Sequence, residues 1–331
     1  MTIKDIARML NVSHTTVSRS LNDSPLISKE TKARVLEIAR KHNYTPNVNA
    51  KSLVLSKSHN IGLFFSTLKE GTTASFFLCS VRGVTKIVNE PYKLVVEAVD
   101  ELKELQYVKK KNFDGIILVS QDPQDDRFIS HVIDNKIPIV VLNREVEKLI
   151  VNTVLTDDRQ GAQETTEYLL DMGHRKIAFI EGKAGFKSTV LRKEGFEQVM
   201  NKMGVNVPGG FIERGNYDLE SGYEAMQRLL QLKARPSAVF CSNDDMAIGA
   251  MKAISDKGLK VPDDVSLIGF DDNGISAYLT PAITTVRRPI EEMSREGATL
   301  LLNIMNNDKD NAIRVIHLKT ELEIRASVKR V

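Results

Sequence analysis

Long apolar runs are missing from the 331 residues of this chain, and cysteine is nearly missing as well. No stretch approaches the ~18 uninterrupted apolar residues that a membrane-spanning helix needs. The first residues lack the apolar core of a secretory signal, so we expect a cytoplasmic protein without a membrane partner. The two cysteines, Cys79 and Cys241, stand far apart in the chain and offer neither a disulfide framework nor zinc-site spacing.

The motifs of common nucleotide-binding and hydrolytic enzymes are absent too. No strand candidate is followed by Gly-x-Gly-x-x-Gly, and no Gly-x-Ser-x-Gly elbow occurs. The nearest lookalike of a phosphate-binding loop, residues 182–188, lacks the glycine directly before its lysine. The six histidines are scattered and show no metal-site spacing. We therefore predict a protein that is not an enzyme and that uses no cofactor and no metal ion.

Charge is present but unevenly distributed, because the net charge of +3 combines two opposite parts. Residues 1–59 hold ten Lys or Arg and four Asp or Glu, a net charge of +6, so the remainder carries −3. A small basic segment ahead of a mildly acidic body is typical of a protein whose N-terminal part alone binds nucleic acid. A solvated basic surface remains an alternative that charge does not exclude.

The basic segment has the pattern of three short helices. Thr2 and Asp5 form a variant capping box that opens a helix over residues 3–10. Only two residues separate that helix from Ser13, which can cap a second helix over residues 14–21. Two helices joined by so sharp a turn, with a third behind them, predict a helix-turn-helix.

The second helix has a polar outer face. Val17 and Leu21 are its inward apolar positions, and its start is the end that enters the major groove in this motif. A Ser/Thr-rich helix start by itself is more often only a cap, but the whole basic arrangement predicts a DNA reader. The side chains able to reach base edges and phosphates are His14, Thr15, Thr16, Ser18 and Arg19.

These motifs resemble the head of the lactose/galactose repressor (LacI/GalR) family. The resemblance rests on Asp-Ile-Ala at 5–7, Thr-Val-Ser-Arg at 16–19 and Asn-Tyr-Thr-Pro-Asn at 43–47, and it continues to the C-terminal end. Asn11 stands where the family usually has Gly, and Asn can adopt the same left-handed backbone. The resemblance implies DNA contacts from Thr2, His14, Thr15, Thr16, Ser18, Arg19, Asn22, Tyr44, Asn47, Ala50, Lys51 and Leu53.

The segment after the head is short. Residues 47–55 make only about two helical turns, which would be marginal as an isolated helix. In the family that this chain resembles, such a stretch folds against its dimer mate in the minor groove, where a Leu wedges between base steps. Leu53 is the matching residue. A plain linker is the alternative, and the lack of Gly and Pro after Pro46 argues mildly against it.

From residue 61 onward, short apolar runs alternate with amphipathic helical stretches. This alternation predicts βαβ units and parallel sheets. Two successive sets predict an α/β core of two parallel-sheet lobes, similar to type I periplasmic binding proteins, behind the all-α helix-turn-helix head. The strand candidates are residues 61–65, 94–96, 115–119, 137–142, 177–180, 238–241 and 266–270, with helices such as 161–172, 221–232 and 244–256 between them.

We divide the chain accordingly. Residues 1–46 are the helix-turn-helix domain, residues 47–59 the hinge helix and linker, and residues 60–331 the effector-binding and dimerisation core. Crossings near Thr156, Thr285 and Arg314 would give an N-lobe of about 60–155 plus 286–314 and a C-lobe of about 156–285 plus 315–331. Such crossings form a hinge, and a ligand that grips both lobes would bias their relative angle.

Polar residues follow several strand candidates, where ligands of open parallel sheets bind. The resemblance implies an effector contact from Arg192, whose planar fork suits two hydroxyls or a carboxylate. It implies another from the carboxylate of Asp271. Asn243 is a further candidate for an effector contact. Asn243 or Asp244 could instead simply cap the helix that follows, and for Asp244 we favour that role.

Aromatic walls of the effector site are implied by the resemblance alone, since a lone aromatic is more often part of a core. Phe76, Phe77 and Tyr217 match the positions that line the family's cleft. The loop before Phe76 departs from the family pattern, which weakens the transfer of contacts to Phe76 and Phe77 and leaves the effector's identity open.

The resemblance implies a sequence-specific transcriptional regulator of carbohydrate-utilisation genes, with a repressor expected. Its partners would be palindromic double-stranded operator DNA and a small effector, for which a sugar is expected. A homodimer is expected, because residues 321–331 lack the apolar heptad tail of the family's tetramers. The alternative is an exported or cytoplasmic sugar-binding protein without regulatory DNA binding, against which the basic head and the missing signal peptide argue.

Overall fold

The computed structural model describes all residues except 22, 43, 45–56 and 307–311. The chain divides into two units, residues 1–58 and residues 59–331, and each is considered by itself. No helix in the described part of the chain is long and apolar enough to cross a membrane.

The first unit is a three-helix bundle, with α1 at Ile3–Leu10, α2 at His14–Leu21 and α3 at Lys29–Lys41. Ile6, Val17 and Val35 are completely buried and form its centre. The predicted sharp turn is present, because Asn11 ends α1 in the left-handed conformation with φ 52° and ψ 45°. The Ser13 hydroxyl caps α2 by accepting a hydrogen bond from the backbone N–H of Thr16 at 3.0 Å.

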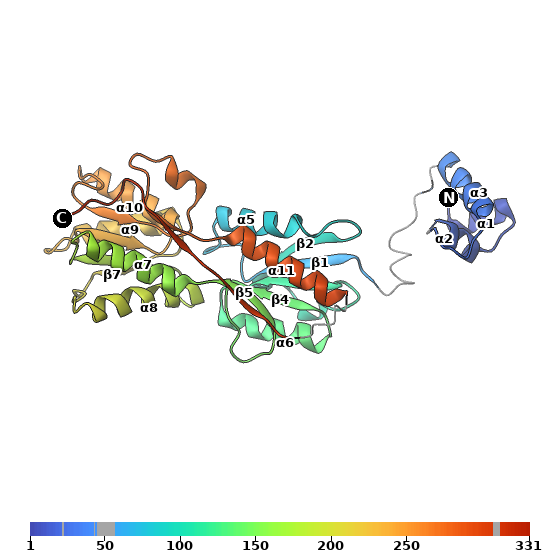
Figure 1. The fold of residues 1–331 in the computed structure, drawn as a ribbon, viewed down its shortest axis with the longest axis horizontal. Coiled ribbons are helices and arrows are strands. Elements are labelled where there is room, and N and C mark those ends of the chain that lie inside the picture. The colour runs from blue at the N-terminus through green and yellow to red at the C-terminus, as the bar shows by residue number, and fades with distance from the viewer. Residues whose placement is uncertain (22, 43, 45–56, 307–311) are drawn as a thin grey trace. The chain divides into compact units, whose positions relative to one another are not determined.

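The second unit has two lobes (Figure 1). The N-lobe contains a six-stranded, all-parallel sheet with strand order β11-β5-β4-β3-β1-β2. Helices α5 and α11 pack together and share an apolar core with one face of the sheet, and α6 shares a second core with the other face. The strands are β1 Asn60–Phe65, β2 Lys93–Ala98, β3 Gly115–Val119, β4 Ile139–Leu142, β5 Asn152–Thr156 and β11 Val315–Leu318. The helices are α5 Ala74–Thr85, α6 Asp126–Asp134 and α11 Ile290–Met305, with short turns η1 Val99–Glu101, η2 Leu105–Tyr107 and η3 Pro123–Asp125.

The C-lobe contains a four-stranded parallel sheet with strand order β7-β6-β8-β9. Helices α9 and α10 pack so closely at Gly249 that a Cβ on this residue would stand 2.0 Å from the backbone oxygen of Leu219. The strands are β6 Ile177–Glu181, β7 Ile212–Arg214, β8 Ala238–Cys241 and β9 Ser266–Ile268. The helices are α7 Asp158–Asp171, α8 Lys187–Lys202, α9 Leu219–Leu230, α10 Asp244–Asp256 and the short turn η4 Gly274–Ala277.

The chain passes between the lobes after β5, through β10 (Thr285–Arg287), and through β12 (Glu321–Glu323), which pairs with β10. The prediction that residues 315–331 all belong to the C-lobe is wrong for β11. That strand pairs in parallel with β5, so that Leu318 lies beside Thr156 in the N-lobe sheet. The third crossing therefore follows Leu318 rather than Arg314. The lobe to which β11 belongs depends on its pairing with the buried strand β5, and no local sequence pattern predicts that pairing.

Candidate functional site

The outer face of α2 carries the predicted DNA-reading side chains. His14, Thr15 and Arg19 are exposed, while Thr16 and Ser18 are half-buried. The Thr16 hydroxyl lies 2.9 Å from the Ser13 hydroxyl, so Thr16 also belongs to the cap of its helix. The face thus combines one guanidinium cation, one imidazole and several hydroxyl groups. His14 and Thr15 stand at the start of the helix, which is where a helix-turn-helix meets base edges.

The other residues predicted to contact DNA differ in their surroundings. Thr2 caps α1, with its backbone N–H and its hydroxyl both donating to the Asp5 carboxylate at 2.8 Å. Tyr44 packs against the core of the head and is half-buried. Five other predicted contacts lie outside the described residues: Asn22, Asn47, Ala50, Lys51 and Leu53.

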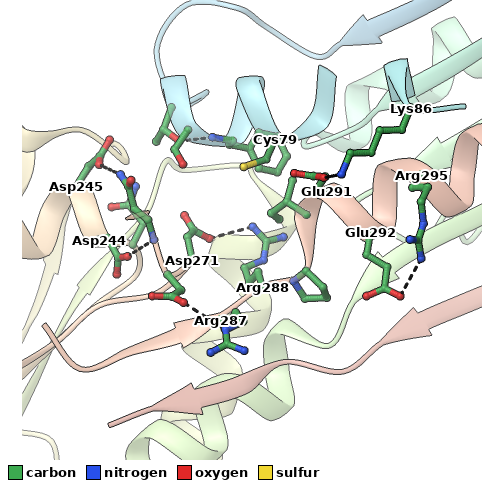
Figure 2. Close-up of a pocket in the computed structure, with 18 residues that line it drawn as sticks. Cys79, Lys86, Asp244, Asp245, Asp271, Arg287, Arg288, Glu291, Glu292 and Arg295 are labelled. Carbon is green, nitrogen blue, oxygen red and sulfur yellow. Dashed lines mark hydrogen bonds and ion pairs between the residues drawn. The ribbon is translucent and has the colours of Figure 1, made fainter. Parts of the chain in front are cut away.

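The predicted effector residues other than Phe77 lie around two adjoining cavities where the two lobes join. A cavity of about 460 Å³ opens there, a size within the range of small-molecule sites. Its walls come from α5 of the N-lobe, the starts of α10 and α11, and the loop after β9 (Figure 2). A much smaller cavity of about 20 Å³ adjoins it and shares Phe76, Asn243 and Asp271 with it. Arg192 and Tyr217 line this smaller, inner cavity.

Arg192 is nearly fully buried on α8, and its charge is balanced. Its Nε and Nη2 lie 3.2 and 2.9 Å from one carboxylate oxygen of Asp158, and Nη2 lies 3.6 Å from the Asp271 carboxylate. Its guanidinium also stacks 3.9 Å from the centre of the Phe270 ring. Burial alone would lower the pKa of Arg192, but its surroundings, led by the Asp158 carboxylate and including that of Asp271, together raise it overall, so Arg192 is a fixed cation.

Arg288 was not predicted, yet it touches both lobes and the hinge between them. Its guanidinium donates to Asn143 of the N-lobe at 2.7 Å, to Thr156 at the first crossing at 3.0 Å and to Asp271 of the C-lobe at 3.1 Å. It also lies 3.0 Å from Asp158. Two arginines therefore face two aspartates, which leaves this buried cluster electrically neutral.

Strained backbone gathers at the same place. Asn143, Tyr217 and Asp271 line the inner cavity with φ of 75°, 66° and 110°, and Asp272, which lines the larger cavity, has φ 55°. Positive φ is costly for residues other than glycine and persists where the surrounding structure enforces it, often at ligand sites. This observation favours the lobe junction as the binding site independently of any sequence motif.

Tyr217 is buried, and its hydroxyl lies 2.9 and 2.8 Å from the hydroxyls of Ser188 and Thr189. Burial raises its pKa, so it remains a neutral phenol. Phe76 is buried beside Arg288 and lines both cavities. Phe77, in contrast, packs against Phe65 with ring centres 5.3 Å apart and lines neither of the two cavities.

Asn243, not Asp244, caps α10. Its side-chain oxygen accepts from the backbone N–H of Met246 at 2.9 Å, and its amide donates to the backbone oxygen of Tyr217 at 2.9 Å. The preference for Asp244 as the cap was therefore wrong. The Asp244 carboxylate instead accepts from the backbone N–H of Asn273 at 2.6 Å and from two hydroxyls, those of Ser276 and Thr285. It anchors the loop that presents Asp271.

Burial raises the pKa of Asp244 to about 7, and the nearby charge of Asp271 adds to the effect. The native state then keeps a proton that the unfolded chain has released above its ordinary value of 3.8. The free energy of unfolding is therefore expected to fall as pH rises from about 4 to about 7. Urea denaturation at several pH values checks this, and Asp244→Asn should flatten the dependence whereas exposed Asp263→Asn should leave it unchanged. Parallel curves for the parent and Asp244→Asn would contradict the prediction.

Within the described residues, no group of three or more His, Cys, Asp or Glu side chains is arranged to hold a metal ion. The functional groups that sequence reasoning missed are Asp158 and Arg288. Asp158 is one of many polar residues that follow a strand, and its local sequence does not distinguish it. Arg288 sits in Arg287-Arg288-Pro289 with no local signal, because its five partners come from four separate parts of the chain.

Comparison with known proteins gives a consistent result. A family model described as bacterial regulatory proteins, lacI family, matches residues 2–47, and one described as a periplasmic binding protein-like domain matches residues 166–328. The chain is 49% identical over 331 residues to a Bacillus subtilis protein named probable HTH-type transcriptional repressor ExuR, covering 100% of this chain and 99% of the relative. It is 32% identical over 334 residues to the Pasteurella multocida HTH-type transcriptional repressor PurR, covering 99% and 98%.

Solved structures agree with these relatives. The lac repressor dimer bound to operator and the anti-inducer ONPF superposes with a TM-score of 0.84 at 25% identity, over 99% of each chain. A complex of the transcriptional regulator CelR with cellobiose superposes with a TM-score of 0.75 at 26% identity, again over 99% of each chain.

Proposed function

The chain belongs to the lacI family of bacterial regulatory proteins, and on that basis we propose that it is a repressor whose affinity for a palindromic operator is set by a sugar bound between its lobes. It is a DNA-binding transcriptional regulator and not an enzyme. The observation that carries the proposal is the pairing, in one chain, of an exposed polar reading helix with a ligand-sized cavity at a lobe junction.

The effector part of the proposal rests on the chemistry of the cavity. Its polar groups include carboxylates, guanidinium groups, two hydroxyls and two amides, and they lie beside the apolar ring of Phe76. The buried cluster of Arg192, Arg288, Asp158 and Asp271 is neutral, and such paired donors and acceptors suit a ligand rich in hydroxyl groups. The relative solved with cellobiose supports the same class of ligand.

The assembly and location follow from the same family membership. We propose that two copies form a homodimer, since a two-fold-symmetric operator is read most simply by two heads related by the same symmetry. The relative solved as a dimer on its operator supports this arrangement. A regulator of this kind works in the cytoplasm, and we propose that location here.

The reading helix provides the first test. His14→Ala and Arg19→Ala are each expected to weaken operator binding roughly 5- to 150-fold, because one good base contact is worth about 1–3 kcal/mol. The operator would be selected by the parent protein from a pool of two-fold-symmetric duplexes and titrated by fluorescence anisotropy. Arg235→Ala, an exposed arginine of the core, is the matched control and should bind as the parent does.

Two outcomes would count against the proposal. If the parent selects no sequence from the pool, the head is not a sequence-specific reader. If both head variants bind like the Arg235→Ala control, α2 is not the reading helix. A titration repeated with a panel of free sugars tests the effector, and operator affinity that no sugar changes would remove the sugar from the proposal.

A further inference from the structure

The strands of the N-lobe sheet all begin at one edge, which we call the linker edge and define by Asn60, Lys93, Gly115 and Ile139, the first residues of β1, β2, β3 and β4. The segment that carries the head joins the core here, at His59, directly before β1 (Figure 1). The opposite ends of these strands point toward the lobe junction and the effector cavity. The linker edge is therefore separate from the site described above.

Five exposed lysines lie along the linker edge, held there by backbone hydrogen bonds. Lys93 donates its backbone N–H to His59 at 2.8 Å, which fixes it beside the start of β1. The backbone N–H of Asp114 donates to the backbone oxygen of Asn60 at 2.9 Å, which fixes the end of the turn over residues 109–113 beside the start of β1. The backbone N–H of Ile116 donates to the backbone oxygen of Pro138 at 2.8 Å. This bond places the turn before β4, which contains Lys136, beside the start of β3. The five are Lys93, Lys109, Lys110, Lys111 and Lys136.

The three consecutive lysines cannot turn inward. Val108 and Phe113 on either side of them are completely buried and anchor both ends of the turn. The backbone N–H groups of Asn112 and Phe113 both donate to the backbone oxygen of Lys109, at 2.8 and 3.1 Å, which closes the turn. Lys109, Lys110 and Lys111 are consequently all exposed, on a support that is rigid rather than frayed.

The five edge lysines differ in their pairing from other lysines of the core. Elsewhere on the core, lysines such as Lys86 and Lys193 pair with Glu291 and Glu181. None of the five edge lysines makes an ion pair with another described residue. Among the described residues within three positions of these lysines in sequence, the acidic ones are Glu90, Asp114 and Asp134, and Asp114 already accepts the backbone N–H of His59 at 2.9 Å. The edge is thus a local excess of positive charge on a body that is acidic as a whole.

We propose that the linker edge is a second DNA-binding surface, which contacts the sugar-phosphate backbone flanking the operator without reading its sequence. The inference rests on the proposed operator binding. Only 14 residues separate Tyr44 of the head from His59, so the edge is tethered within roughly 50 Å of the head. Lysine is a flexible point charge suited to phosphate, and phosphate contacts fix the position of a protein on DNA without reading its sequence.

The test compares two duplexes that share one two-fold-symmetric site selected by the parent protein. The short duplex ends at the site, and the long one continues for about 10 base pairs, one helical turn, on each side. The variant K109A/K110A/K111A is expected to bind the short duplex as the parent does. On the long duplex, we expect roughly tenfold weaker binding at 0.1 M salt. The slope of log affinity against log salt should also be smaller by about 2, since we expect each subunit to lose one phosphate contact, each lost contact removes about 0.9, and two subunits contribute.

Two matched variants complete the design. K109R/K110R/K111R keeps the charge and should retain the parent's affinity for the long duplex. K233A/K257A/K260A removes three exposed lysines of the C-lobe and should have no effect. Circular dichroism of each variant verifies folding. Equal binding of the long duplex by K109A/K110A/K111A and the parent would overturn the proposal, as would an equal loss in K233A/K257A/K260A. Failure of the parent to select any site is a different result, because it would overturn the proposed function itself.

Discussion

Asp158→Ala is expected to lower the free energy of unfolding by roughly 3–5 kcal/mol, the usual cost of removing one partner from a buried ion pair. Asp158 lies 2.9 Å from Arg192 and 3.0 Å from Arg288, and the side chains of all three are at most 4% exposed. Burial alone would raise the pKa of Asp158, but the two guanidinium groups hold it below its usual value. Without this carboxylate, two buried cations would face each other with only Asp271 between them.

Chemical denaturation of the parent and the variant measures this difference. Asp171→Ala, which removes an exposed aspartate at the end of the same helix, is the matched control and should change the free energy of unfolding by less than about 0.5 kcal/mol. Should Asp158→Ala prove no less stable than Asp171→Ala, the buried cluster does not hold the two lobes in the way that its distances indicate.

Asp271→Ala is expected to weaken effector binding roughly 10- to 150-fold, while operator affinity without effector stays near that of the parent. Asp271 is the least buried member of the charged cluster, with a side chain 20% exposed at the cavity. A carboxylate that accepts from ligand hydroxyls contributes about 1.5–3 kcal/mol. Its backbone is held at φ 110°, a conformation that is costly for a residue other than glycine and that persists where the surrounding structure enforces it.

Calorimetric titration with the sugar that shifts operator binding of the parent measures the loss. Asp263→Ala, an exposed aspartate of the C-lobe, serves as the control and should bind that sugar normally. Unchanged affinity in Asp271→Ala would place the effector elsewhere. Loss of both effector and operator binding would instead indicate a general folding defect, and the measurement would then be repeated with the isosteric Asp271→Asn.

The head is the part of the fold that sequence predicts best. The bounds of α1 and α2, the left-handed Asn11 and the Ser13 cap all follow from residues within four positions of one another. In the core, the alternation of apolar runs with helices predicts two parallel-sheet lobes correctly. It misses β5, β7, β10, β11 and β12, because these short strands contain polar residues and so lack a long continuous apolar run.

The proposed effector site likewise contains residues that the sequence predicts and residues that it misses. Arg192, Asp271 and Tyr217 are predicted through family resemblance and meet at the inner cavity, whereas Phe77 does not line it. The placement of Phe77 follows from helical geometry, because consecutive residues of α5 point in different directions and only one of the two rings can face the cavity. Asp158 and Arg288 belong to the site only because the crossings bring β5, α7 and the start of α11 together.

Local sequence patterns are enough to predict the kind of protein: a basic helix-turn-helix head on an acidic two-lobed α/β core, with no membrane-spanning run. Those features depend on caps, turns, periodicity and charge, which act between neighbours in the chain. Contacts between distant segments place β11 beside β5, join Arg288 to both lobes and bring five lysines to the linker edge. Such arrangements depend on strand pairing and burial between segments far apart in sequence, and no local pattern encodes which segments will meet.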